Sequence, residues 1–176
     1  MPRERDIPTS DRTSDRTGAR LGDNRLGDRS RDNARKAAMA AFASASAADL
    51  RQLSEAAGLP LDAETLRGPE TGLVTVRGRI GGGGAPFNTG EATVTRATVR
   101  LPSGQVGHAY ALGRDKEKVR LAAILDAIWC GEETRETVQE KVVAPLVRMA
   151  AEADARRRGE TAATRVDFFT MVRGED

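Results

Sequence analysis

Four arginines in two predicted strands are the residues best placed to do chemistry. The strands are predicted over residues 71–80 and 91–101, and each carries two arginines on one face. If the strands pair in the right register, four guanidinium groups share one surface and could bind phosphate, phosphonate or a partner's carboxylates. The alternative is a basic, solvent-facing surface of a half-buried sheet, and the sequence leaves both open. The four residues are Arg77, Arg79, Arg96 and Arg100.

Two further segments could contact an anion. The run Gly81–Gly84 has the backbone freedom of a phosphate-binding loop, but Pro86 and a strand follow it where such loops need a helix. We therefore interpret it as a flexible turn. Arg114 and Lys116 flank Asp115, the predicted N-cap of a helix, and Arg114 is a candidate contact for an anion or a partner.

The residues that usually carry catalysis are nearly absent. The chain has one histidine, His108, and one cysteine, Cys130, so neither a disulfide within the chain nor a Cys/His metal site can form. We expect His108 to be a packed or surface residue and Cys130 a small buried hydrophobic residue. No pair of carboxylates stands out as acid and base. The sequence therefore predicts no catalytic residue, no metal and no cofactor site in this chain.

Composition separates a charged tail from a single domain. The 176 residues carry a net charge of only +2, which does not favour a nucleic-acid or membrane binder. In residues 1–32, Asp and Arg alternate with few apolar residues, which predicts a disordered tail. Residues 33–176 form the predicted domain. No apolar run reaches the roughly 20 residues that cross a bilayer, so we expect a soluble, cytoplasmic protein.

The elements that must position these residues follow from periodicity and caps. An Ala-rich helical segment runs over residues 35–57, with Ser46 as the N-cap of its second part and Gly58 as its end. Residues 61–70 are predicted to be a polar connection. Strands over residues 71–80, 91–101 and 106–112 form an antiparallel meander.

The C-terminal half is predicted to be mainly helical. A helix begins after Asp115 and ends at Gly131, and helical periodicity returns over residues 134–158. Pro145 interrupts it, which predicts a kink or a second helix with the proline in its first turn. Alternation over residues 165–172 predicts a fourth strand. The fold class is thus α+β, with a small antiparallel sheet packed with helices.

Three stretches together resemble the PhnG family, the small G subunit of the bacterial carbon–phosphorus lyase core complex. The resemblance covers residues 36–174, and its most specific part is the terminal run Thr-Arg-Val-Asp-Phe-Phe-Thr-Met-Val-Arg-Gly. The stretches are Glu70–Arg79, then Gly90–Leu101 followed by Gly113–Lys116, and then Ala144–Leu146 with Thr164–Gly174. His108 stands where this family is expected to have an aromatic or small residue.

The resemblance implies an accessory role in phosphonate catabolism. PhnG-like proteins assemble with H, I and J subunits, of which the I subunit is the closest expected partner. With the L protein, the G, H and I subunits support transfer of ribose 5-triphosphate from ATP to an alkylphosphonate, releasing adenine. The nucleosidase-like chemistry is assigned to the I subunit, and a radical iron–sulfur J subunit later cleaves the C–P bond. No catalytic residue of G is implied.

The terminal run also predicts a partner surface. In a strand over residues 165–172, Phe168 packs inward, whereas Phe169 and Met171 face the other side as exposed apolar residues. With Arg173 they form the candidate interface. Two other functions remain open, namely a stand-alone anion-binding module that uses the strand arginines and an RNA-binding protein that uses the tail.

Overall fold

The structure is a computed structural model that describes residues 21–79 and 83–164, with side chains from residue 29 onward. By its contacts the chain divides into two units, Met1–Ala34 and Arg35–Asp176. Helix α1, Leu21–Ser44, begins within the first unit and continues into the second. Its first residues fall inside the predicted tail, so helical structure starts before the predicted onset of order near Asn33. Residues 1–20 of that tail lie outside the described residues.

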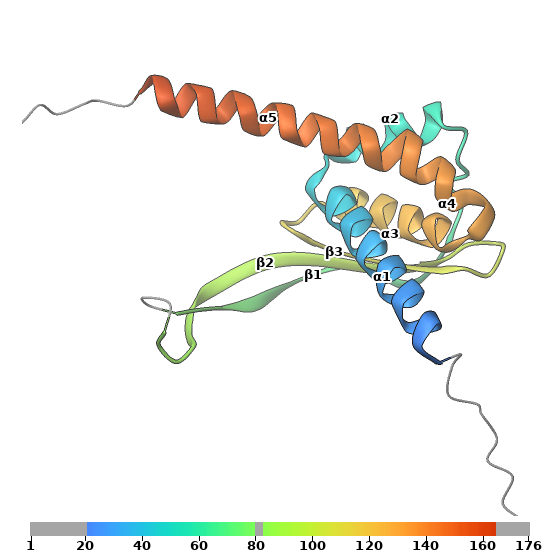
Figure 1. Ribbon diagram of the computed structural model, residues 1–176, viewed down its shortest axis with the longest axis horizontal. Helices are drawn as coiled ribbons and strands as arrows, with labels where there is room; N and C mark the ends of the chain where they lie inside the picture. Colours follow the sequence, from blue (N-terminus) through green and yellow to red (C-terminus); the bar gives the residue numbers. More distant parts are fainter. Residues whose placement is uncertain (1–20, 80–82, 165–176) are drawn as a thin grey trace, which may run out of the picture. The chain divides into compact units, whose positions relative to one another are not determined.

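Three antiparallel strands form the sheet, in the order β1-β2-β3, as the alternation predicts. They are β1 Glu64–Gly78, β2 Phe87–Arg100 and β3 Val106–Leu112 (Figure 1). The prediction of a connection over residues 61–70 is wrong from Glu64 onward, because β1 already pairs with the end of β2 there. This pairing is irregular around Pro69, with register shifts between Thr65 and Glu70. Its polar sequence has no strand periodicity, which is why alternation does not reveal it.

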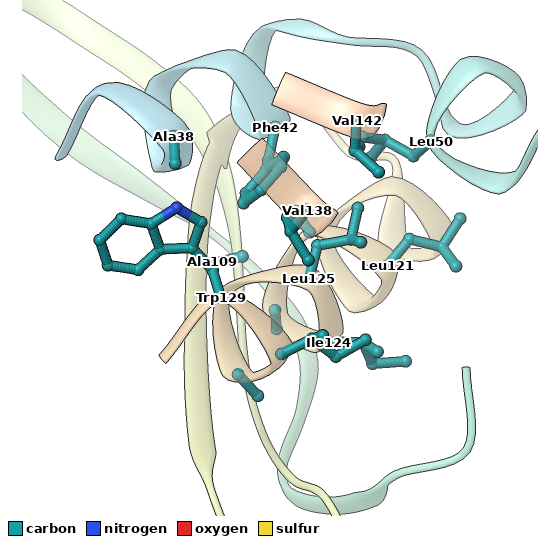
Figure 2. Close-up of a cluster of buried hydrophobic side chains, with 14 of the residues drawn as sticks. Ala38, Phe42, Leu50, Ala109, Leu121, Ile124, Leu125, Trp129, Val138 and Val142 are labelled. Carbon is teal, nitrogen blue, oxygen red and sulfur yellow. The ribbon is translucent and has the colours of Figure 1, made fainter. Parts of the chain in front are cut away.

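Helix α3, Lys116–Cys130, covers one face of β2 and β3. Its predicted N-cap is confirmed, since the side chain of Asp115 accepts a hydrogen bond from the Lys118 amide at 2.8 Å. The buried face of the sheet is the one that carries Ala97, Val99 and Ala109. Together with α3 they form a hydrophobic core in which Trp129 is the largest side chain (Figure 2).

The N-terminal helices complete this core. Phe42 of α1 and Leu50 of α2, Ala47–Ala56, are both fully buried in it (Figure 2). The predicted break between the two helices is confirmed: the hydroxyl of Ser46 accepts a hydrogen bond from the Asp49 amide at 3.1 Å. The predicted stop is also confirmed, because Gly58 has a φ of 68°, a conformation that favours glycine.

Of the two predictions for the segment around Pro145, the structure confirms the second, a new helix with the proline in its first turn. Helix α4, Glu132–Val138, passes into the π-helical turn η1, Gln139–Val143, and then into α5, Ala144–Ala163. The proline lies in the first turn of α5 and has no amide hydrogen to donate. The preceding residue, Ala144, donates instead to the Gln139 carbonyl five residues back, which is the hydrogen bond of a π-helical turn.

The fold class is therefore α+β, with helices packed on a three-stranded antiparallel meander. The predicted fourth strand over residues 165–172 lies outside the described residues. Within the described ranges, no helix is both long and apolar enough to cross a membrane.

Candidate functional site

The candidate arginines of β2 lie on the face of the sheet that α3 leaves uncovered, which we call the outer face. Arg96 lies opposite Glu70 of β1, and their side chains are joined at 2.6 Å. Arg100 lies opposite Glu64, at 3.6 Å between guanidinium and carboxylate. Each arginine of β2 thus already faces a carboxylate, which reduces its capacity to hold a separate anion.

A third arginine, Arg67, joins this group although the sequence gives no sign of it. Its Nε donates to the same oxygen of Glu70 at 2.5 Å. The hydrogen bonds from Arg96 and then Arg67 hold the pKa of Glu70 below its usual range. All three side chains are about half exposed, so water screens this network. Arg67 lies three residues before Glu70 in the irregular part of β1, where register shifts interrupt the alternation from which a shared face could be predicted.

The arginines of β1 are at the other end of the strand pair, so the four do not gather on one patch. Arg77 lies opposite Asn88, which is eight positions from Arg96 along β2. At roughly 3.3 Å per residue this is about 26 Å. Arg79 follows the end of β1 and is exposed. The expectation of a single four-arginine surface fails because the strands are long and the two pairs sit at opposite ends.

Arg114 lies at the turn between β3 and α3. With Lys116 it borders a shallow hollow whose other residues come from β1 and β2, among them Thr71 and Thr93. Two cations close to a helix N-terminus favour an anion electrostatically, but Asp115 places a carboxylate at the same helix end. Charge alone therefore does not distinguish an anion from a partner's acidic residue at this hollow.

Neither the histidine nor the cysteine is placed for catalysis. His108 is exposed on the outer face, and its Nδ1 lies 3.1 Å from the Thr98 hydroxyl. Cys130 is half-buried at the end of α3, so it is less buried than predicted. In the part of the chain that the structure describes, no group of three or more His, Cys, Asp or Glu residues could hold a metal ion.

One buried carboxylate was not anticipated, and its role is structural. Asp126 of α3 is only 1% exposed, and Arg35 of α1 contacts both its oxygens, at 2.9 and 2.8 Å. The amide of His108 donates to the same carboxylate at 2.9 Å. Asp126 thereby ties α1, α3 and β3 together. It is the one charged residue in the otherwise apolar run Leu121–Trp129, and this is a signal that could have identified it.

The remaining candidates, Phe169, Met171 and Arg173, lie outside the described residues. The described part presents an apolar groove between α1 and α5, bordered by Ala41, Val147 and Ala150. It presents no cluster of acid, base and nucleophile.

Comparison with known proteins assigns the chain to a family. A family model described as "Phosphonate metabolism protein PhnG" matches residues 33–174. A curated protein of Rhizobium meliloti (strain 1021) is 62% identical over 111 residues, which are 63% of this chain and 70% of that protein. It is named "Alpha-D-ribose 1-methylphosphonate 5-triphosphate synthase subunit PhnG".

Proposed function

Because this chain belongs to the PhnG family, we propose that it is the G subunit of an alpha-D-ribose 1-methylphosphonate 5-triphosphate synthase. In this role it supports the transfer of ribose 5-triphosphate from ATP to an alkylphosphonate, with release of adenine, in phosphonate catabolism. The observation that carries the proposal is the 62% identity to a protein named as that subunit.

The chain acts as an accessory component of the enzyme. Its described residues hold no metal cluster, and the arginines of β2 are engaged by Glu70 and Glu64. We assign the reacting groups to other subunits, and we assign no cofactor to this chain. The H, I and J subunits are the proposed partners, with I in closest contact, and use of ATP places the complex in the cytoplasm.

Reconstitution tests this function. The chain is co-expressed with the H, I and J subunits of the same organism, and the complex is purified through a tag on H. Adenine release from ATP is then measured after addition of the L protein and methylphosphonate. We expect the chain to co-purify in fixed proportion, and its omission to abolish adenine release.

Two results would contradict the proposal. One is a chain that elutes alone while the other subunits form an active assembly without it. The other is tight binding of ATP or methylphosphonate by the isolated chain, since that is the behaviour of a stand-alone anion-binding module. Calorimetric titration of the isolated chain with both ligands separates the two functions.

A further inference from the structure

The β1–β2 pair extends well beyond the helix that covers the rest of the sheet. Figure 1 shows the ends of β1 and β2 running past α3 as a two-stranded arm. We define this arm as residues 73–78 and 87–93, because β3 pairs with β2 only from Val94 onward. An isolated two-stranded ribbon is marginally stable in water. The arm therefore lacks, within the described part of its own chain, the layer that would stabilise it.

The two faces of the arm differ in chemistry. The face continuous with the buried side of the sheet carries mainly polar residues, including Thr75, Glu91 and Thr93, together with Leu73, which is 64% exposed. The opposite face, which continues the outer face of the sheet, has no charged side chain among the described residues of the arm. Its one hydroxyl, that of Thr89, is satisfied by the Val76 carbonyl at 3.0 Å. We call this second surface the outer arm face.

The outer arm face and the β3 residues next to it carry four exposed large apolar side chains. Val76 is 44% exposed and Phe87 43%, and the neighbouring Tyr110 and Leu112 of β3 are 51% and 71% exposed. Val94 is 5% exposed but is not part of the hydrophobic core, because it points to this outer side. Single exposed apolar residues are ordinary, but a contiguous group of them marks an interaction surface.

Two glycines leave the backbone of the same surface accessible. Gly72, at the base of the arm, and Gly90 fall on it by the alternation and register of the strands, and a Cβ added at either would have no neighbour within 4 Å. Without side chains at these positions, a partner can approach the backbone closely. The outer arm face thus combines an apolar centre with access to the strands, as expected of the centre of a protein–protein interface.

The charges at the base of the arm indicate which kind of partner fits. There Arg96 and Arg67 share the single carboxylate of Glu70 on the outer face, so this end of the surface has an excess of positive charge. At the tip, Arg77 follows Val76 by one residue and lies on the opposite face, so it does not border this surface. A second copy would bring its uncharged outer arm face or its own cationic base to this end, and neither supplies an unpaired carboxylate. The surface therefore fits a different protein with carboxylates at the end that meets the base.

We propose that the outer arm face is the docking surface for another subunit of the synthase, which covers it with an apolar patch that is bordered by acidic residues at the base of the arm. This inference rests on the proposed function. That subunit covers the apolar side of the arm, which is the side opposite to the one that α3 covers on the rest of the sheet. Arg67 and Arg96 at the base fix the register of the contact.

Two lysine substitutions one residue apart test the surface. Val76→Lys places an ammonium group on the outer arm face, and Thr75→Lys places one on the opposite face, where it lies across from Glu91. Both positions are exposed, so both variants should fold with the far-ultraviolet circular dichroism of the wild type. Each is co-expressed with the H, I and J subunits, and its dissociation constant for the purified HIJ assembly is measured. We expect at least a tenfold increase for Val76→Lys and less than a threefold change for Thr75→Lys.

A second variant tests the same surface at a position on another strand. Leu112→Lys alters the same surface from β3 and should weaken binding as Val76→Lys does. The docking surface is excluded if both variants bind like the wild type, or if Thr75→Lys weakens binding equally. It is also excluded if the isolated chain is a dimer that Val76→Lys dissociates. A wild-type chain that binds no subunit overturns the proposed function instead, so the two failures are distinguishable.

Discussion

At the residue scale, Asp126 is the one charged side chain that is buried in the described structure. Its carboxylate is 1% exposed, and an ion in the interior needs a partner and full hydrogen bonding to be tolerated. Arg35 supplies two hydrogen bonds and the His108 amide supplies another. The arrangement fixes the position of the second half of α1 on the core through one charge pair.

Removing the arginine should therefore destabilise the domain strongly. We expect Arg35→Ala to lower the free energy of unfolding by about 2–3 kcal/mol, toward the low side for a broken buried pair, because Arg35 itself is one-third exposed. Urea denaturation followed by circular dichroism measures the change.

The double variant Arg35→Ala with Asp126→Asn is the matched control. It removes both charges, so it should recover part of the stability that Arg35→Ala loses. A single variant within about 0.5 kcal/mol of the wild type would show that the carboxylate does not depend on Arg35.

At the scale of elements, β3 and α3 approach each other most closely at Gly107. A Cβ added to this glycine would meet the Ala123 carbonyl and the Ala127 amide, and would lie 2.7 Å from the Ala127 Cβ. Two of these three contacts are backbone atoms, which cannot rotate away. The small residue is thus a condition for the packing of helix on sheet.

Gly107→Ala should consequently force α3 away from β3. We expect a loss of at least about 2 kcal/mol in the free energy of unfolding, since the overpacking is against backbone. Gly72→Ala is the control, because a Cβ there has no neighbour within 4 Å and the strand is exposed. Equal melting temperatures for the two variants would contradict the close approach.

Local signals predicted some of these elements, and long-range contacts decided the others. Ser46 and Asp115 reveal helix starts because a cap depends on the next three residues alone. The pairing of Glu64 with Arg100 joins segments 36 residues apart and leaves no periodic trace. The ion pairs of Arg96 with Glu70 and of Arg100 with Glu64 depend on this pairing of β1 with β2, so these partners could not be read from composition or spacing. Alternation does reveal the two faces of the arm, but not that α3 stops short of it.

At the scale of the whole molecule, two elements of the second unit reach beyond the core. The arm is one of them. Helix α5 is the other, because Leu146 is the only one of its described residues that is buried. A helix with a single buried residue gains little from its own chain, because tertiary packing normally supplies most helical stability. Both elements are consistent with a chain that reaches its full stability as a subunit of an assembly.

The terminal run Thr164–Gly174 is the end of the family match, and it follows directly on α5. Its alternation predicts that Phe168 packs inward and Phe169 faces outward, although both lie outside the described residues. We expect Phe169→Asp to keep the wild-type circular dichroism and melting temperature but to lose co-purification with the H, I and J subunits. Phe168→Asp, its neighbour with the same change, should instead lower the melting temperature. If Phe169→Asp unfolds the domain, Phe169 belongs to the core and the predicted faces of this strand are reversed.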